Sequence, residues 1–428
     1  MSGVLWGIIS GCLTEIRPLA PRICYPMTNP SSLFPTLQLH KRQERRALSG
    51  HGWIYSNEID AKQVPLTNFS PGQIVNVETH DRRWIGNGYI NPHSLILIRI
   101  VSRDPQQPFS ESLIVARLRL AAAHRDRLYG QPYYRMVYGE SDFLPGLVID
   151  RFGAVFVVQI NTAGMELMKD AIVQGLQSEF SAVAIVLRCD TPQRNLENLP
   201  AYSETIGPLP SPVIVEEHGA KFEIDLHDGQ KTGWFYDQRD NRAALLPLVK
   251  GKTVIDVCSY VGAWGIGAAV AGAKQVICVD VSEKALEQVA INAKLNEVED
   301  RVISAQGDAF EILKSLRADN HHSDIVILDP PAFVKRKKDL KNGTEAYTRL
   351  MRRGLQLVHD DGILVTCSCS FHMPRELFVQ QLNQAGQDVQ RALQVFREGR
   401  QGMDHPVHPA MSETEYLKVF FARVLGKI

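Results

Sequence analysis

The sequence lacks three features that would assign it most directly to a class of protein: long apolar runs, closely spaced cysteines and an excess of one charge. No stretch of about 18 consecutive apolar residues is present, so the sequence predicts no transmembrane helix. Its seven cysteines are scattered over 428 residues, which excludes the disulfide framework of a small secreted domain and favours a reducing cytoplasm. Because 47 basic and 47 acidic residues balance, the net charge neither requires nor excludes a nucleic-acid partner.

The chain is long enough for two or three domains, and its local patterns change along its length. Residues 1–35 are interpreted as a poorly ordered leader. From 36 to 104, short runs such as "GQIVNVET" and "LILIRIVS" alternate with turn residues and predict a small β-barrel. Residues 105–215 combine a helical segment at 111–128 with strands such as "VFVVQIN", which predicts a central α+β domain. Within it, residues 134–153 are predicted to be a turn-rich connection.

Residues 216–428 alternate apolar strands with helical segments, which is typical of an α/β domain with a parallel sheet covered by helices. Such sheets bind ligands at the carboxyl ends of their strands. One strand leads into "DVCSYVGAWGIGAAVAG", where Asp256 and Gly262 lie at a strand-to-helix turn. Glycines at such a turn let the backbone approach a ligand, although glycines that permit close helix packing give nearly the same pattern.

Acidic residues also stand at the next two strand ends. Asp280 is placed to bind ribose hydroxyls, and Asp308 is placed to face an adenine amino group. A dinucleotide would bring phosphates, which the carboxylate of Asp256 would repel. The three acidic strand ends therefore favour S-adenosylmethionine (SAM), whose amino-acid end is zwitterionic, over a nicotinamide cofactor.

The following strand ends in "ILDPPAFVKRKKDL". Its two prolines stiffen a loop that can hold the Asp329 carboxylate against a flipped base. Taken alone, the DPPF-like tetrapeptide in this stretch suggests methylation of an exocyclic amine, which requires no covalent catalysis. The next strand end, "LVTCSCSFHM", points to different chemistry, because a thiolate there can add to C6 of a pyrimidine and make C5 nucleophilic toward a methyl sulfonium.

The two cysteines of that strand end, Cys367 and Cys369, admit other interpretations. A metal site that includes His372 lacks the CxxC spacing and a fourth ligand nearby. A disulfide between residues i and i+2 of an extended strand would be strained. One of the two cysteines could be buried and inert, and both can share one face, so the end of the strand decides which thiol reaches the base.

Two basic clusters suit contact with an RNA backbone. The first lies ahead of Trp53 and Tyr55, on which bases can stack, and comprises Lys41, Arg42, Arg45 and Arg46. The second follows the DPPAF loop and comprises Lys335, Arg336, Lys337 and Lys338. For each cluster, the alternative is a solvated helix face or loop with no ligand.

Four motifs in order resemble the ribosomal large subunit methyltransferase I family of SAM-dependent 23S rRNA cytosine-5 methyltransferases: "GQKTGWFYDQRDNR", "LDPPAFVKRKKDL", "TCSCS" and "HPVHPAMSETEYLKVFFARV". The resemblance covers about residues 36–428. It implies an N-terminal PUA domain, a central domain and a C-terminal Rossmann-like class I methyltransferase domain at 216–428. It also implies 23S rRNA or a large-subunit assembly intermediate as partner, and it is consistent with a homodimer.

The resemblance also assigns roles to individual residues. The segment 230–242 is expected to lie against SAM, with contacts from Tyr236, Gln238 and Arg239. The remaining expected SAM contacts are Asp256, Ser259, Gly262, Asp280 and Asp308. Asp329 would hold the pyrimidine edge, while Cys367 is the expected nucleophile and Cys369 the second choice. No metal site is expected.

The leading prediction is a cytoplasmic enzyme that forms 5-methylcytidine in large-subunit rRNA through a covalent cysteine adduct. One rival is an rRNA guanine methyltransferase that uses the DPPAF loop without covalent catalysis. Another is a catalytically silent RNA-binding factor of ribosome assembly. A uracil-5 activity would be distinguished by the modified nucleoside.

Overall fold

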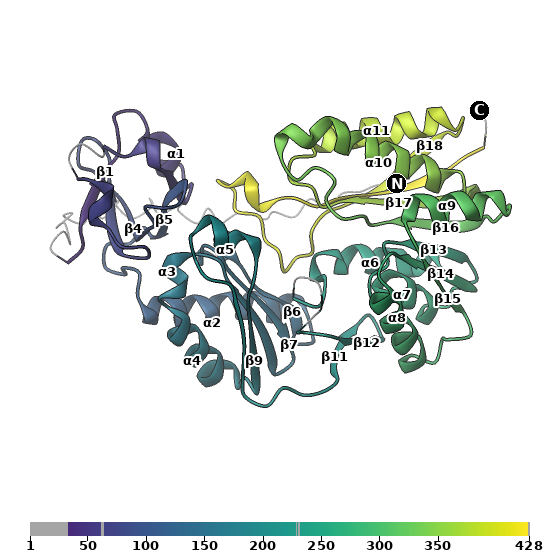
Figure 1. Ribbon diagram of the computed structural model, residues 1–428, viewed down its shortest axis with the longest axis horizontal. Coiled ribbons are helices and arrows are strands. Elements are labelled where there is room, and N and C mark those ends of the chain that lie inside the picture. Colours follow the sequence, from purple (N-terminus) through teal and green to yellow (C-terminus); the bar gives the residue numbers. More distant parts are fainter. Residues whose placement is uncertain (1–32, 61–63, 228, 230–231, 427–428) are drawn as a thin grey trace, which may run out of the picture.

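Three sheet-based parts follow one another along the long axis of the molecule (Figure 1). The computed structural model describes residues 33–60, 64–227, 229 and 232–426. Almost all of the expected leader, residues 1–35, lies outside these ranges. Within them, no helix combines the length and apolarity needed to cross a membrane.

The N-terminal part is a five-stranded sheet that curls onto itself. Its order is β1-β3-β4-β5-β2, with a short helix, α1 (Glu44–Leu48), between β1 and β2. The strands are β1 (Thr36–Gln38), β2 (Trp53–Tyr55), β3 (Ile74–Glu78), β4 (Trp84–Ile90) and β5 (Ile96–Ser102). A bridge between Leu39 and Ile59 joins the chain beyond the two edge strands, and the inward apolar side chains form one core. The predicted small β-barrel is therefore confirmed.

The central part is a second five-stranded sheet, β10-β9-β8-β7-β6, packed on helices. Its strands are β6 (Tyr133–Tyr138), β7 (Leu147–Phe152), β8 (Val155–Ile160), β9 (Ala184–Cys189) and β10 (Tyr202–Ile206). Its helices are α2 (Glu111–Leu128), α3 (Ala163–Glu166), α4 (Lys169–Phe180) and α5 (Pro192–Leu196). The helix predicted at 111–128 has the expected bounds, and the Ser110 hydroxyl caps it by accepting a hydrogen bond from the Leu113 backbone N–H.

The prediction of a turn-rich connection at 134–153 is wrong. These residues form most of the antiparallel pair β6 and β7, and the turn residues between them occupy only a short connection containing a 3-10 turn at Gly139–Asp142. Apolar side chains on both sides of the turn, such as Val137 and Ile149, are fully buried in the central core. Tertiary burial of those flanking residues makes strands of a segment whose turn residues are its most visible feature.

The C-terminal part is a seven-stranded sheet with the order β15-β14-β13-β16-β17-β19-β18. Its strands are β13 (Thr253–Val257), β14 (Gln275–Asp280), β15 (Val302–Gln306), β16 (Ser323–Leu328), β17 (Val358–Ser368), β18 (Leu393–Gly399) and β19 (Lys418–Val424). A hairpin of β11 (Val213–Glu217) and β12 (Ala220–Ile224) precedes it. The predicted parallel sheet is confirmed for the first five strands, whereas β19 enters antiparallel between β17 and β18.

Helices cover both faces of this sheet (Figure 1). One core contains side chains of α7 (Ala263–Val270) and α8 (Glu283–Leu295), near α6 (Arg239–Leu245). The core on the other face contains side chains of α9 (Ala309–Ala318), α10 (Leu340–Leu355) and α11 (Arg375–Asp388). The strand order reverses at β13, which has β14 on one side and β16 on the other. A crevice for a ligand is expected at this reversal, beyond the carboxyl ends of the strands.

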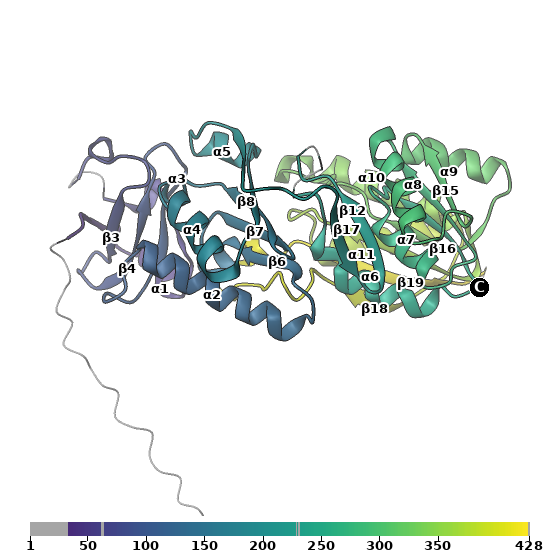
Figure 2. The same cartoon turned by 90° about the horizontal axis from the view of Figure 1, so that it is seen from below.

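The segment 400–417, between β18 and β19, leaves the C-terminal sheet and runs over the central part (Figures 1 and 2). Its anchor is Asp404, whose Oδ2 accepts a hydrogen bond from the Arg135 backbone N–H at 2.8 Å. The Asp404 carbonyl accepts one from Arg125 Nη2, also at 2.8 Å. Arg125 is fully buried and makes a bidentate ion pair with Asp142, at 2.6 and 2.8 Å. The ion pair and the segment are thus held by one guanidinium.

Replacing Arg125 with methionine should destabilise the protein by about 3–5 kcal/mol, because the carboxylate of Asp142 is left buried without its counter-charge. The matched control is Arg119→Met on the same helix, which breaks the exposed pair of Arg119 with Glu179. That control should cost less than about 1 kcal/mol. Thermal denaturation of both variants measures the difference, and equal midpoints would contradict the role given to Arg125.

Candidate active site

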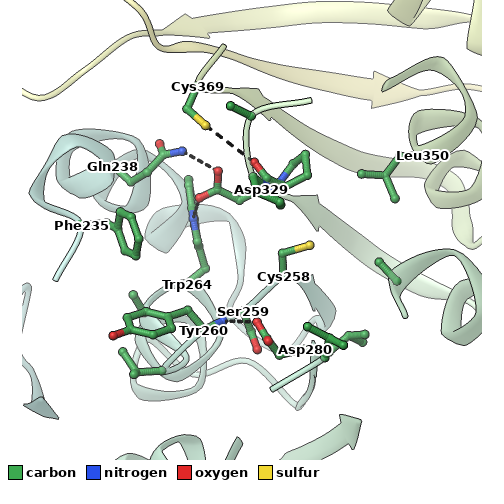
Figure 3. Close-up of a pocket in the computed structure, with 18 of the residues that line it drawn as sticks. Phe235, Gln238, Cys258, Ser259, Tyr260, Trp264, Asp280, Asp329, Leu350 and Cys369 are labelled. Atoms are coloured by element: carbon green, nitrogen blue, oxygen red, sulfur yellow. Dashed lines mark hydrogen bonds between the residues drawn. The ribbon is translucent and has the colours of Figure 1, made fainter. Parts of the chain in front are cut away.

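A pocket of about 570 Å³ opens at the carboxyl ends of β13, β14, β15 and β16, at the strand-order reversal (Figure 3). Two of its walls come from the loops after β13 and β16, and segment 400–417 supplies another. Among the lining residues are Trp234, Phe235, Gln238, Cys258, Ser259, Tyr260, Trp264, Asp280, Val281, Asp308, Phe310, Asp329, Phe333, Cys369 and Tyr416. Apolar and aromatic walls with a few convergent polar groups are typical of a small-molecule site.

The loop after β13 takes its shape from residues in the left-handed backbone region. Cys258, Tyr260 and Gly262 have φ values of 62°, 50° and 84°. A Cβ atom on Gly262 would lie 2.9 Å from Ile266 Cγ1, so this position requires glycine both for its conformation and for space. Gly262 itself does not line the pocket, whereas its neighbours Val261 and Ala263 do.

Asp256 lies beneath the same loop and is fully buried. Its Oδ2 accepts a hydrogen bond from the Gly265 backbone N–H at 2.9 Å, while Oδ1 has no hydrogen-bond partner among the described residues. Burial raises the pKa of Asp256 to about 7. The residue does not line the pocket. The expectation that Asp256 contacts SAM is therefore not met, because the start of α7 lies over its carboxylate.

Asp280 and Asp308 line the pocket at neighbouring strand ends, as predicted. Asp280 accepts hydrogen bonds from the Tyr260 and Ser282 backbone N–H groups, at 2.8 and 2.9 Å, and each oxygen keeps further acceptor capacity. Asp308 caps α9 through its Oδ1. Ser259 also lines the pocket. These groups, beside the apolar Val281 and Phe310, fit the ribose hydroxyls and adenine of SAM.

Of the three predicted contacts in segment 230–242, Gln238 alone lines the pocket. Tyr236 is buried and donates its hydroxyl to the Arg151 carbonyl at 2.9 Å. Arg239 donates to the Tyr133 carbonyl at 2.6 Å and stacks its guanidinium over Tyr129. Both side chains point to the central part, which corrects their expected role as cofactor contacts. Residues 230 and 231 lie outside the described residues.

Asp329 lies on the pocket wall with both carboxylate oxygens engaged (Figure 3). Oδ1 accepts a hydrogen bond from Gln238 Nε2 and Oδ2 accepts one from Trp264 Nε1, each at 3.0 Å. Burial raises the pKa of Asp329, although these two hydrogen bonds lower it. The geometry gives Asp329 a fixed orientation, and its remaining lone pairs can meet a substrate edge.

The pocket contains a cysteine at the end of β17, and that cysteine is Cys369. It is half-buried, and its Sγ lies 3.9 Å from the Pro330 carbonyl oxygen (Figure 3). Cys367 is fully buried in the sheet core, and burial raises the pKa of its thiol well above the ordinary range. Because β17 ends at Ser368, Cys367 belongs to the strand and is held in the core of the sheet. Cys369 follows the end of the strand and lines the pocket. The structure thus places Cys369 in the pocket, whereas the sequence had favoured Cys367.

Two further residues, Cys258 and Lys418, were not predicted from the sequence to belong to the site. Cys258 lines the pocket, but burial raises the pKa of its thiol to about 12, so it is a poor nucleophile. Lys418 lies beside Cys369, with Nζ donating to the Ser370 and Tyr416 carbonyls at 2.6 and 2.7 Å. Burial lowers the pKa of Lys418 to about 8, and ionised Cys369 raises it. A cation is therefore available near the thiol.

The aromatic walls were also missed as ligand contacts. Five aromatic lining residues come from three separate stretches of sequence: Trp234, Phe235, Tyr260, Trp264 and Phe333. A signal for the first two was present in the "GWFY" run of the quoted motif. Trp264 carries no such signal, because a tryptophan at the start of a helix is as compatible with core packing as with a site.

Each of the two basic clusters contains one arginine in an ion pair. Lys335, Arg336, Lys337 and Lys338 are all exposed, directly after the Asp329 loop, and Arg336 pairs with Asp339 at 3.2 Å. Lys41, Arg42 and Arg45 are exposed near α1, whereas Arg46 makes a bidentate ion pair with Glu58 and lies over the Tyr55 ring. Arg46 is thus committed to holding the N-terminal sheet. Over the described ranges, no cluster of His, Cys, Asp and Glu could hold a metal ion.

The buried carboxyl of Asp256 gives stability a predictable pH dependence. Its folded-state pKa of about 7 lies above the ordinary 3.8, so its protonation stabilises the fold fully below about pH 4, and this contribution is lost as the pH rises through 7. The loss is at most about 4 kcal/mol. Compared with Asp256→Asn, which cannot ionise, the wild type should lose thermal stability between pH 5 and 8.

The control for this comparison is Asp324→Asn at the opposite end of the sheet. Burial raises the pKa of Asp324, but the hydrogen bonds from Thr253 and Lys252 together lower it by more than burial raises it. The pKa of Asp324 is therefore below its ordinary value. Both its folded and unfolded forms are ionised above pH 5, and its difference from wild type should stay constant between pH 5 and 8. A constant difference for Asp256→Asn as well would contradict the raised pKa.

Comparison with known proteins agrees with this geometry. Residues 37–103 match the family of PUA-like domains, and residues 202–388 match that of S-adenosylmethionine-dependent methyltransferases. The chain is 36% identical over 394 residues to "Ribosomal RNA large subunit methyltransferase I" of Shewanella denitrificans, covering 91% of this chain and 99% of the relative. It is 34% identical over 400 residues to the protein of the same name from Klebsiella pneumoniae, covering 92% and 99%.

Solved structures show the same fold over nearly the whole chain. A protein from Streptococcus mutans described as a SAM-dependent methyltransferase has a TM-score of 0.76 at 20% identity, covering 91% of this chain and 100% of its own. A methyltransferase complexed with S-adenosylhomocysteine has a TM-score of 0.78 with the same identity and coverage. The sequence relatives and the pocket together show that the chain is a SAM-dependent methyltransferase, and it belongs to the ribosomal RNA large subunit methyltransferase I family.

Proposed function

We propose that this enzyme methylates C5 of a cytosine in large-subunit (23S) rRNA through a covalent adduct with Cys369. The observation that carries the proposal is that a half-buried thiol lies in the same pocket as the carboxylates suited to SAM. Transfer to an exocyclic amine would not need a thiol at that place. The other cysteine of the motif, Cys367, is buried and packs in the core.

Cytosine C5 is a weak nucleophile until C6 is attacked. In the proposed reaction, the Cys369 thiolate would form a bond to C6, and the electron pair gained at C5 would attack the methyl carbon of SAM. The bond from that carbon to sulfur would break, and the sulfur would keep the electron pair and leave as S-adenosylhomocysteine. SAM supplies that methyl group when bound. A base then removes the C5 proton, and the electron pair of that C–H bond restores the C5–C6 double bond and expels the thiolate. The cysteine is regenerated, so atoms and charges balance.

The surroundings of Cys369 support its role. The ammonium group of Lys418 favours the thiolate form of a nearby cysteine by charge attraction. The Pro330 carbonyl oxygen lies 3.9 Å from Cys369 Sγ, and the Asp329 carboxylate lines the same pocket. Both groups keep lone pairs that can accept a hydrogen bond from a cytosine amino group. Gln238 and Trp264 hold Asp329 in place for that contact.

An rRNA substrate agrees with the names of the relatives and with the PUA-like domain at 37–103. The exposed run Lys335–Lys338 follows the Asp329 loop, so its four charges flank the entrance through which a base would be inserted. We further propose domain boundaries near residues 35, 104 and 215. The substrate can be free rRNA or a large-subunit assembly intermediate, and the cytoplasmic location and the homodimer stay predictions.

Replacing Asp280 with asparagine should weaken SAM binding about 10- to 100-fold, because a charged acceptor for the ribose hydroxyls is lost. The control Asp319→Asn removes an exposed carboxylate at the far end of α9, outside the pocket, and should bind SAM like the wild type. Titration calorimetry with SAM measures both. Equal affinities in the two variants would exclude Asp280 as the ribose contact.

Replacing Cys369 with alanine should abolish formation of 5-methylcytidine, because no thiolate then reaches C6. Cys367→Ala should keep the reaction but lower the thermal stability, since it leaves a cavity in the core. Nucleosides from large-subunit rRNA treated with enzyme and methyl-labelled SAM are identified by mass spectrometry. A transcript carrying 5-fluorocytidine should trap a covalent complex with wild type and Cys367→Ala, and none with Cys369→Ala.

Each rival function has a distinct result in the same experiment. Labelled methylguanosine formed by wild type and Cys369→Ala alike would favour the amine methyltransferase. Labelled 5-methyluridine that depends on Cys369 would keep the mechanism and change the base. SAM binding without any labelled nucleoside from rRNA or assembly intermediates would favour the silent assembly factor.

A further inference from the structure

A second pocket, of about 290 Å³, lies where the N-terminal sheet, the central part and segment 400–417 meet. Arg103 enters it from the end of β5, Arg117 from α2, Phe143 from the connection between β6 and β7, and His408 from segment 400–417. None of these residues lines the active-site pocket. The pocket is therefore a separate feature, formed by three distant stretches of sequence.

The two arginines of this pocket donate to backbone carbonyls. Arg103 donates to the Ile85 and His51 carbonyls, at 3.3 and 3.1 Å. Arg117 donates to the Phe143 carbonyl and, at 2.7 Å, to the Val101 carbonyl. Among the described residues, neither guanidinium forms an ion pair. Burial lowers the pKa of both, that of Arg117 to about 10, yet both remain protonated at neutral pH. An anion bound in the pocket would offset the free-energy cost of burying these two positive charges.

The aromatic residue of the pocket is presented outward. Phe143 is 55% exposed and has a φ of 59°, a left-handed conformation that is rare for a bulky side chain. Its ring meets His408 edge to face, with centroids 5.5 Å apart, and the Arg117 guanidinium lies 5.8 Å from its centre. A ring held in a costly conformation with much of its surface in solvent suits stacking against a flat ligand.

Among the residues that the structure describes, Glu140 is the one carboxylate that lines the pocket. Its Oε1 accepts a hydrogen bond from Trp53 Nε1 at 3.0 Å, which ties it to the N-terminal sheet. Two arginines against one carboxylate leave the pocket with a net positive charge. Guanidinium groups offer planar, paired donors that match phosphate oxygens, and the neighbouring ring offers a stacking surface.

We propose that this pocket binds one nucleotide of a single-stranded RNA segment, with the phosphodiester on Arg103 and Arg117 and its base on Phe143. The inference rests on the proposed RNA substrate and adds a second point of attachment away from the reacting base. Segment 400–417 contributes His408 here and Tyr416 to the active-site pocket, so the two RNA contacts share one support. A carboxylate of a protein partner is the competing occupant.

The test measures binding of transcribed large-subunit rRNA between 50 and 300 mM KCl, without methyl transfer. Arg103→Gln should weaken binding about 5- to 20-fold and reduce the slope of log affinity against log salt by about 0.7 to 1, as expected for one lost phosphate contact. Phe143→Asn, which tolerates the left-handed conformation, should weaken binding about fivefold or more and leave the slope unchanged. The control is Arg119→Gln, an exposed arginine two residues from Arg117 that pairs with Glu179. It should match the wild type.

SAM affinity and the denaturation midpoint show that each variant is folded, and Phe143→Asn decides the matter if Arg103→Gln is unstable. Wild-type affinity and salt slope in both variants would overturn the inference and leave the proposed reaction standing. If the two variants bind rRNA like the wild type but lose affinity for an acidic peptide that the wild type binds, the pocket is assigned to a protein partner instead. A wild-type protein that does not bind rRNA at all would overturn the inference and the proposed substrate together.

Discussion

The buried guanidinium of Arg125 is the interaction on which the arrangement of the three parts depends. Its donors are directed at the Asp142 carboxylate, the Arg135 carbonyl and the Asp404 carbonyl, so a charge removed from water is compensated by hydrogen bonds on several sides. Through Asp404, it fixes segment 400–417 across the central part. That segment lines both pockets, and the catalytic sheet and the N-terminal sheet are thereby placed with respect to a common support.

The charges in the active-site pocket favour a cationic ligand and disfavour the ionisation of its cysteines. Carboxylates at 280, 308 and 329 give this end of the sheet a negative character that suits the positive sulfonium and ammonium groups of SAM. The same charges disfavour a thiolate, and burial adds to this at Cys258 and Cys367, whose pKa values are raised. Cys369 stands one residue past the end of β17, and the ammonium group of Lys418 lies near enough to interact with its charge. The antiparallel strand β19 brings that lysine, so the departure from a purely parallel sheet has a chemical consequence.

Several features could be predicted because they depend on contacts close in sequence. The helix at 111–128 has its cap and its apolar spacing within one stretch, and the carboxyl ends of parallel strands must gather at one edge. For that reason, the placement of Asp280, Asp308 and Asp329 around one pocket could be predicted. The roles of Tyr236 and Arg239 could not be predicted, because residues facing the central part and residues facing the pocket alternate within one short turn, and only the position of the central part distinguishes them.

The sequence by itself determined the three-part organisation, the acidic residues at the strand ends that line the pocket and the presence of a thiol near the DPPAF loop, since each follows from periodicity or from a motif within one segment. The tertiary structure alone decided which cysteine reaches the pocket, that Asp256 is buried beneath the loop, and that Arg103, Arg117, Phe143 and His408 meet. The physical reason is that burial and charge pairing are set by neighbours distant in sequence. Cys367 lies within β17 and its thiol is in the core, whereas Cys369 lies one residue past the end of β17 and its thiol is in the pocket.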